Sequence, residues 1–248
     1  MDVHKTLEQN KNSWNKNFKK YYGTTALPHY GCNIPLETEL NLFGDILNKS
    51  ILEICCGSGH SLLYLAKKGA KNLWGVDISE SQIAVASELL NQNDIEAKIM
   101  ISSMENDPGL PHDYFDVVYS IYGLGWTLDL KTTLSNISKY LKKDGILIFS
   151  WDHPFMHCVD EENEQLLFTG NYHDEDVYSF IKENSKFTII NRKFSTYINS
   201  LYDLGFIVER IIEENRGLNE AEEFTSNYYS KVKSNHFPLS FIIKARKL

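Results

Sequence analysis

The chain has 248 residues, 42% of them hydrophobic, and a formal net charge of −8. This length and apolar content suffice for one large domain with a sizeable core, and the acidic balance argues against nucleic acid as a partner, because phosphate binding needs a basic face. We see no signal peptide, no apolar run of membrane-spanning length and no CxxC pair among the four cysteines, and therefore expect a cytoplasmic protein with reduced thiols and no membrane partner.

Residues 1–36 precede the first predicted strand and form a polar, helical segment with an aromatic face. This face consists of Trp14, Phe18, Tyr21 and Tyr22. It either packs on the core or forms a lid that covers a ligand site. An amphipathic helix is then predicted over residues 36–47, with its apolar stripe on the sheet.

The stretch from Ile51 to His60, ILEICCGSGH, predicts a strand, a glycine turn and the start of a helix. Gly57 and Gly59 allow the backbone to pass close to a ligand, and the following helix N-terminus presents free N–H groups to it. A tight turn without any ligand would need the same glycines. Glu53 favours the ligand site, because a carboxylate in a buried strand is costly without a partner.

Asp77 ends the next predicted strand, which begins at Lys71. An acidic residue at this place hydrogen-bonds a ribose diol in nucleotide-binding folds. A dinucleotide-binding turn would also need a third glycine three residues after Gly59, where this chain has Leu62. We therefore expect a nucleoside-like ligand other than NAD, which disfavours a dinucleotide oxidoreductase.

Strands and helices continue to alternate as far as Trp151. The pattern predicts a helix after Ser79, strands over 98–103 and 115–120, a helix over 130–141 and a strand over 145–151. Five alternations indicate an α/β fold with a parallel, doubly wound sheet. The ligand is expected at the carboxyl ends of its strands.

The alternation stops in residues 153–193, which are acidic and aromatic. A segment of this length in a compact fold usually has a function, so we interpret it as a cap inserted over the active site. Within it we expect a short hairpin that pairs LLF (166–168) with FTIIN (187–191).

The chain is predicted to close with a helix and a pair of strands. The expected elements are a helix over 194–206, strands over 206–213 and 239–246, and a loop on the substrate side over 214–236. We expect one domain, 1–248, in four parts: an N-terminal lid (1–36), a cofactor-binding core (37–152), a cap insertion (153–193) and the closing helix and strands (194–248).

ILEICCGSGH and the following LWGVDIS (73–79) resemble the first two motifs of the class I S-adenosylmethionine-dependent methyltransferases. The first motif of that family is an acid followed by three glycines at alternate positions, and here Cys55 replaces the first glycine. The resemblance continues through SSMEND (102–107), DYFDVVYSIYGLGW (113–126) and LKKDGILIFSWDHP (141–154). The resemblance covers about half the chain, residues 51–154. Within the family, the chain resembles the small-molecule, methyltransferase-domain 11-like type.

The resemblance implies a Rossmann-like, doubly wound, seven-stranded sheet that is mostly parallel with the last strand antiparallel. A helical lid would precede this sheet, and an insertion would follow its fifth strand. The implied cofactor is S-adenosyl-L-methionine. The residues expected to bind it are Glu53, Cys55, Gly57, Gly59, Asp77, Ile78, Ser103, Met104, Ser120 and Tyr30.

Methyl transfer is an in-line displacement, so the protein must hold the acceptor in line with the methyl group. A hydroxyl or amine acceptor also needs a base, and His153 is the candidate because it directly follows the fifth strand. Alternatively, His153 only turns the chain. The further substrate-contact candidates are Tyr22, Tyr122, Trp126 and Arg192. No metal is expected, because His157 and Cys158 beside His153 make only part of a ligand set.

The predicted function is transfer of a methyl group from S-adenosylmethionine to an unidentified small-molecule acceptor. A non-catalytic protein that binds S-adenosylmethionine or S-adenosylhomocysteine is the alternative, in which loss of His153 would have no consequence. The acidic, aromatic cap favours the enzyme. The sequence leaves the oligomeric state open.

Overall fold

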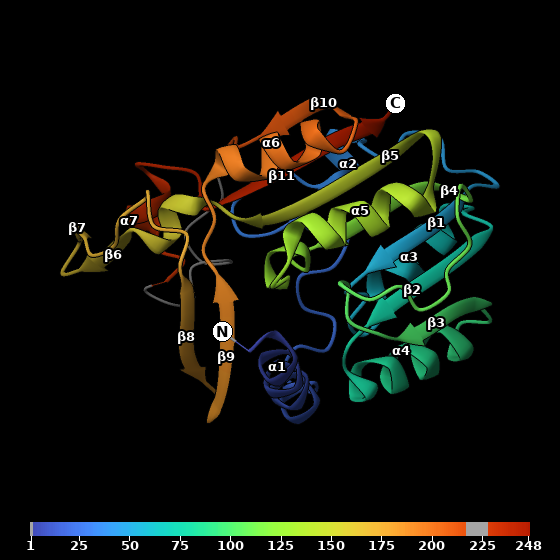
Figure 1. The fold of residues 1–248 in the computed structure, drawn as a ribbon, viewed down its shortest axis with the longest axis horizontal. Coiled ribbons are helices and arrows are strands. Elements are labelled where there is room, and N and C mark those ends of the chain that lie inside the picture. Colours follow the sequence, from blue (N-terminus) through green and yellow to red (C-terminus); the bar gives the residue numbers. More distant parts are fainter. Residues whose placement is uncertain (1, 217–227) are drawn as a thin grey trace.

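The computed structural model describes residues 2–216 and 228–248. Its main feature is a seven-stranded sheet in the order β10-β11-β5-β4-β1-β2-β3 (Figure 1). The strands are β1 (Ser50–Ile54), β2 (Asn72–Asp77), β3 (Ala97–Ile101), β4 (Phe115–Ile121), β5 (Leu141–Asp152), β10 (Phe206–Ile212) and β11 (Ser240–Lys247). The five strands from β5 to β3 are parallel, and β11 is antiparallel to both of its neighbours. The expected α/β fold with an antiparallel last strand is confirmed.

The strand order reverses at β1. The chain runs from β1 outward to β3 and then returns to β4 on the other side of β1. In open α/β sheets, ligands bind at the carboxyl ends of the strands beside such a reversal. The residues that end or directly follow β1, β2 and β4 are Cys55, Asp77 and Tyr122.

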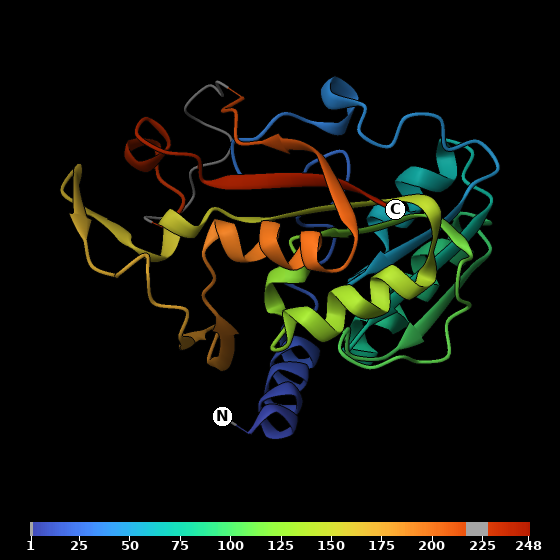
Figure 2. The same ribbon diagram turned by 45° about the horizontal axis from the view of Figure 1, so that its top comes forward.

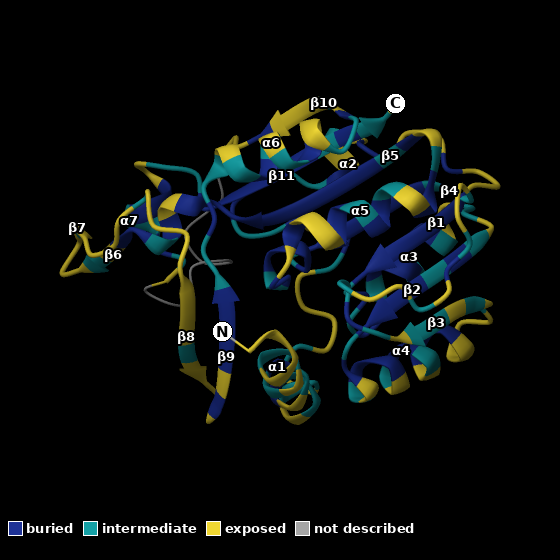
Figure 3. Cartoon of the chain, in the orientation of Figure 1, coloured by how far each residue is buried: buried dark blue, intermediate teal, exposed yellow. Residues whose placement is uncertain are grey.

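Helices cover both faces of the sheet (Figures 1 and 2). Helices α5 (Leu130–Tyr140) and α6 (Phe194–Asp203) pack on one face, and α3 (His60–Lys67) and α4 (Glu80–Gln92) pack on the other. The central strands are buried on both faces (Figure 3), which is usual for parallel strands that lie between two helical layers.

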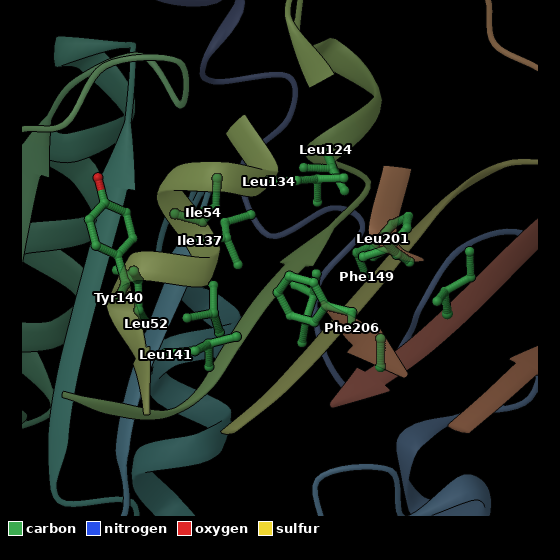
Figure 4. Close-up of a cluster of buried hydrophobic side chains, with 14 of the residues drawn as sticks. Leu52, Ile54, Leu124, Leu134, Ile137, Tyr140, Leu141, Phe149, Leu201 and Phe206 are labelled. Atoms are coloured by element: carbon green, nitrogen blue, oxygen red, sulfur yellow. The ribbon is translucent and has the colours of Figure 1, made fainter. Parts of the chain in front are cut away.

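Alternate residues of β1 belong to different cores. Leu52 packs in the cluster with α5, where Leu134 and Ile137 meet Phe149 of β5 (Figure 4). Ile51 packs in the second cluster with α3. This alternation follows from the two-residue repeat of a strand. It also directs Glu53 away from the α5 cluster.

Helix α1 (Val3–Asn17) lies between α4 and a hairpin of the insertion (Figure 1). On the hairpin side, the Asn10 amide donates to the Thr188 carbonyl at 2.7 Å and accepts from the Thr188 N–H at 2.9 Å. On the α4 side, the side-chain oxygen of Asn15 accepts from the Ser79 hydroxyl at 2.6 Å. The N-terminal helix therefore joins the insertion to the start of α4.

Only Glu37–Leu40 of the helix predicted over residues 36–47 is helical, as α2. Asn41 takes a left-handed conformation with φ 47° and ends it. The buried Glu37 carboxylate then accepts hydrogen bonds from the backbone amides of Leu42 at 2.9 Å and Phe43 at 3.2 Å. These bonds satisfy amides that a longer helix would have paired internally. The prediction is wrong beyond residue 40.

The insertion forms two separate hairpins, not the expected single one. They are β6 (Val159–Glu162) with β7 (Gln165–Phe168), and β8 (Val177–Lys182) with β9 (Ser185–Ile190). Each hairpin turns through two residues with positive φ, Asn163 and Glu164 in the first and Glu183 and Asn184 in the second, as in a type I′ turn. The expected pairing of residues 166–168 with 187–191 is wrong, because each strand pairs with its neighbour in the chain across a tight turn.

The remaining elements are short. They are η1 (Leu124–Trp126), η2 (Pro154–His157) and α7 (Lys231–Ser234). The loop predicted over 214–236 contains α7, and its residues 217–227 lie outside the described part of the chain. β5 begins at Leu141, four residues before its predicted start.

Within residues 2–216 and 228–248, no helix combines the length and apolar character needed to cross a bilayer. In the same residues, His, Cys, Asp and Glu side chains form no group of three suited to a metal.

Candidate active site

The turn after β1 contains three residues with positive φ, namely Cys55 (60°), Gly57 (50°) and Gly59 (78°). A Cβ on Gly57 would meet no protein atom within 4 Å, so open space lies over the turn. A Cβ on Gly59 would lie 3.1 Å from that of Ala86, so this glycine allows α3 and α4 to pack closely. Cys55 keeps the backbone conformation of the glycine that it replaces, at a cost of about 1–2 kcal/mol.

Asp77 organises this turn from the end of β2. Its two carboxylate oxygens accept hydrogen bonds from the backbone amides of Gly57 and Ser79, both at 2.9 Å. Burial raises the pKa of Asp77 to about 6, although these amide donors oppose the rise. The carboxylate is thus fixed beside the glycine turn and retains acceptor capacity for a ligand diol.

Glu53 has a buried carboxylate oxygen, Oε2, with no hydrogen-bond partner among the described residues. Burial raises the pKa of Glu53 well above its ordinary value, while the hydroxyls of Tyr119 and Ser61 lower it. The side-chain oxygen of Gln82, on the first turn of α4, is likewise buried and unpaired. Unpaired buried acceptors are costly, so these atoms suit a ligand with N–H and O–H donors.

A small second cavity of about 40 Å³ lies beside the turn. Ile78, Ser103 and Met104 line it, together with Cys55 and Trp126. The structure therefore brings together four of the residues expected to bind the cofactor, Cys55, Ile78, Ser103 and Met104. The buried Ser103 hydroxyl has no hydrogen-bond partner within the described residues and is available to the nucleobase of a ligand.

The main cavity has a volume of about 1250 Å³ and extends from this turn to the insertion. We call the end lined by Glu53, Gly57 and Asp77 the cofactor half, and the end lined by Trp126 and Asp152 the acceptor half. A cavity for one drug-sized ligand usually measures about 300–1,000 Å³. The volume therefore leaves room for a second ligand beside a nucleoside-like one.

Aromatic rings form the walls of the acceptor half. Trp126 is the central ring, with centroids 5.0 Å from Trp14 of α1, 5.8 Å from Trp151 of β5 and 5.6 Å from Phe187 of β9. These side chains come from four parts of the chain. The aromatic face expected in residues 1–36 supplies Trp14 and Tyr21 to this wall.

Asp152 is the buried carboxylate of the acceptor half, and it was not among the expected site residues. Tyr228 donates its hydroxyl hydrogen bond to one carboxylate oxygen at 2.9 Å, and Tyr229 donates to the other at 2.7 Å. The Tyr122 hydroxyl lies against Ser240 and also lowers the pKa of Asp152, whereas burial raises it. Asp152 ends β5 and directly precedes His153. The alternation of side chains along a strand indicates that only one of two adjacent residues faces the site, but not which one.

His153 is not placed for catalysis. It is 5% exposed, does not line the cavity within the described residues, and its Nε2 lies 2.9 Å from the Glu213 carboxylate. Its ring stacks on Phe194 at 5.9 Å. The geometry favours the alternative that His153 holds the end of β5. His157, one turn later, does line the cavity, and burial lowers its pKa.

Two of the four expected substrate contacts do not reach the lining of the cavity within the described residues. The Arg192 guanidinium is buried and donates to the Thr127 carbonyl at 2.6 Å. Tyr22 is 46% exposed and packs edge-on against His60 at 4.7 Å, while Tyr21 faces the cavity. Arg192 and Tyr22 are therefore placed for packing. The other two, Tyr122 and Trp126, do line the cavity.

Two expected cofactor contacts are likewise core residues. Tyr30 is fully buried and donates to Glu37 at 2.7 Å, which anchors the segment after α1. Ser120 is fully buried and donates to the Ile54 carbonyl at 2.8 Å, which ties β4 to β1. A sequence pattern indicates that such residues lie near a strand end or a lid, and not which way their side chains point.

Comparison with known proteins identifies the same region. Residues 51–145 match the family model described as a methyltransferase domain. An uncharacterized protein of Haemophilus influenzae is 28% identical over 227 residues, which cover 85% of this chain and 86% of that protein. The demethylmenaquinone methyltransferase of Lactococcus lactis is 34% identical over 117 residues, 45% of each protein.

The fold is also shared with solved structures. A putative S-adenosylmethionine-dependent methyltransferase from Listeria monocytogenes superposes with a TM-score of 0.69 at 22% identity, covering 86% of this chain and 97% of that one. An S-adenosylmethionine-dependent methyltransferase from Mesorhizobium loti gives 0.67 at 18% identity, covering 85% and 96%.

The cofactor half fits S-adenosylmethionine on this chain's own geometry. Asp77 offers an ionisable acceptor for a ribose diol, and the unpaired oxygen of Glu53 offers one for an ammonium group. Open space lies over Gly57, where the ligand would lie. Residues 51–145 thus match a methyltransferase domain, and the chain has the fold of S-adenosylmethionine-dependent methyltransferases.

Proposed function

We propose that this methyltransferase acts on a small molecule bound in the acceptor half of the main cavity. The observation that carries the proposal is the continuity of one cavity from Asp77 to Asp152. Bound S-adenosylmethionine supplies an activated methyl group, and the chain's task is to place an acceptor in line with it. The aromatic side chains between Asp77 and Asp152 can hold an apolar acceptor there.

The position of the acceptor half supports a small molecule. Besides residues of β5, its walls include α1, the hairpin β8–β9 and the pair Tyr228 and Tyr229, none of which belongs to the seven-stranded sheet. Such walls surround a ligand, whereas a long polymer needs an open groove. The net charge of −8 also disfavours nucleic acid, which needs a basic surface.

The test is a labelled methyl transfer to separated acceptor pools. The purified chain would be titrated with S-adenosylhomocysteine by calorimetry, and then incubated with methyl-labelled S-adenosylmethionine and either a metabolite extract or the macromolecules of a lysate. We expect label in the metabolite pool, and at least tenfold less of it with Asp77→Ala when the cofactor concentration is below saturation. Label in protein or RNA alone would refute the small-molecule proposal. Cofactor binding without transfer to either pool would favour a non-catalytic binding protein.

A further inference from the structure

The acceptor half contains a buried carboxylate, Asp152, that forms no ion pair within the described residues. Asp152 is 6% exposed, and its described hydrogen bonds come from tyrosine hydroxyls, which are neutral. Within residues 2–216 and 228–248 it forms no ion pair with Lys, Arg or His, and residues 217–227 contain none of these types. A buried carboxylate in this situation favours a cation from outside the chain.

Two basic groups, Lys233 and His157, interact with this carboxylate electrostatically, but neither lies within ion-pair distance of it. Lys233 does not line the cavity; its ammonium lies 4.0 Å from Asp160 and 5.3 Å from the centre of the Tyr228 ring. His157 lines the cavity; burial lowers its pKa although Asp152 raises it, and the net lowering favours the neutral imidazole near pH 7. Asp152 therefore has room for an ion-pair partner supplied by a ligand.

The aromatic walls suit a cation on an apolar body. Trp126, Trp14 and Phe187 present ring edges and faces around the acceptor half, and aromatic faces attract cations through their quadrupole. Tyr21 of the same wall already has the Lys182 ammonium 5.5 Å from its ring centre. A flat or apolar body would pack between the rings while its charged end reaches Asp152.

The rim of the acceptor half is negatively charged, as Asp152 is. Asp160, Asp174 and Asp176 line it. Among the described residues that line the cavity, Lys182 is the single lysine and there is no arginine. A cleft lined by one sign of charge raises the local concentration of the opposite ion. Asn191 also contributes a buried side-chain oxygen with no partner in the described chain, which is a further acceptor for N–H groups.

We propose, resting on the proposed function, that the methyl acceptor is an amine on an apolar or aromatic body, with its nitrogen bound by Asp152. The amine arrives as an ammonium ion and loses a proton to the Asp152 carboxylate. The freed lone pair then forms the new nitrogen–carbon bond, while the carbon–sulfur bond breaks and its electron pair stays on sulfur. The products are the N-methyl ammonium ion and S-adenosylhomocysteine, so charge and atoms balance.

The test compares three ligands of the same shape on the full chain saturated with S-adenosylhomocysteine. They are 2-phenylethylamine, 2-phenylethanol and phenylacetate, and binding is followed by calorimetry and by quenching of tryptophan fluorescence. We expect the amine to bind at least tenfold more tightly than the other two and to be methylated when S-adenosylmethionine is supplied. This comparison uses the wild-type protein alone, so its outcome does not depend on whether a variant folds.

Asp152→Asn should weaken amine binding at least tenfold and leave the affinity for S-adenosylhomocysteine unchanged. The matched control is Asp94→Asn, the same change at an exposed residue after α4. Equal binding of the three ligands, preference for the alcohol or acid, or no amine binding at millimolar concentration would overturn the inference while leaving the proposed function intact. Failure to bind S-adenosylhomocysteine would instead refute the function.

Discussion

Asp77→Ala removes the carboxylate that we expect to hold the ribose of the cofactor. Hydrogen bonds to a charged acceptor contribute about 1.5–3 kcal/mol, which corresponds to about 10–150-fold in the dissociation constant. The loss should lie toward the upper end, because the same carboxylate holds the amides of Gly57 and Ser79 at 2.9 Å and so fixes the turn. Calorimetric titration with S-adenosylhomocysteine measures this change directly.

The raised pKa of Asp77, about 6, adds a pH dependence. The ribose needs the ionised carboxylate, so the affinity of the wild type should fall about tenfold per pH unit below 6, and Asp77→Ala should lack this step. The stability of the free protein changes in the opposite direction. The pKa of Asp77 is higher in the folded chain than its usual 3.8, so the folded state binds this proton more tightly than the unfolded state does. The free energy of unfolding should therefore decrease by about 3 kcal/mol as the pH rises from 3.8 to about 6.

The control for both measurements is Asp94→Ala, which removes an exposed carboxylate outside the cavity. It should bind S-adenosylhomocysteine like the wild type at every pH. A folded Asp77→Ala variant with wild-type affinity would refute the assignment of Asp77 to the ribose. A wild-type affinity that stays constant from pH 7 to pH 5 would contradict the argument about its ionisation.

Three further substitutions test other parts of the site. His153→Ala should lower the melting temperature, because it removes the buried contact with Glu213, and should leave turnover at saturating substrate within about twofold; loss of turnover in a stable variant would restore its catalytic role. Gly125→Ala would place a Cβ 1.8 Å from the Trp151 ring, and should cost about 1–3 kcal/mol of stability in chemical denaturation; an unchanged midpoint would show that the ring can move aside. Asn10→Ala breaks two buried hydrogen bonds to β9 and should speed hydrogen exchange in α1; unchanged exchange would show that α1 is held by packing alone.

The cofactor half could be predicted from the sequence because its signals are local. Glu53, Gly57 and Gly59 lie within seven residues of one another, and Asp77 ends the next strand. The backbone accounts for their positions, since the two glycines adopt positive φ, Asp77 ends β2 and Glu53 is the last residue but one of the buried β1. A local pattern of this kind fixes both where a residue lies and what surrounds it.

The acceptor half could not be predicted in the same way, because its residues come together only through tertiary contacts. Trp14 and Phe187 are far apart in the chain, and they meet because Asn10 binds the β9 backbone. The choice between Asp152 and His153 depends on the side of β5 that each faces. That side is set by the pairing of β5 with β11, in which Asp152 lies opposite Ser240. Nothing within the WDHP motif itself fixes this register.

Helix α1 connects the wall of the acceptor half with the chain segment that follows Asp77. Trp14 is part of the acceptor wall, while the next residue, Asn15, holds Ser79 at the start of α4, two residues after Asp77. A cofactor that orders the turn around Asp77 therefore also orders the support of α1, and α1 in turn fixes the wall that an acceptor contacts. We therefore expect amide hydrogen exchange in α1 to slow when S-adenosylhomocysteine binds, and an acceptor to bind more tightly to the loaded protein than to the free chain, because the cost of ordering α1 is then already met. Unchanged exchange in α1 on cofactor binding would refute this coupling.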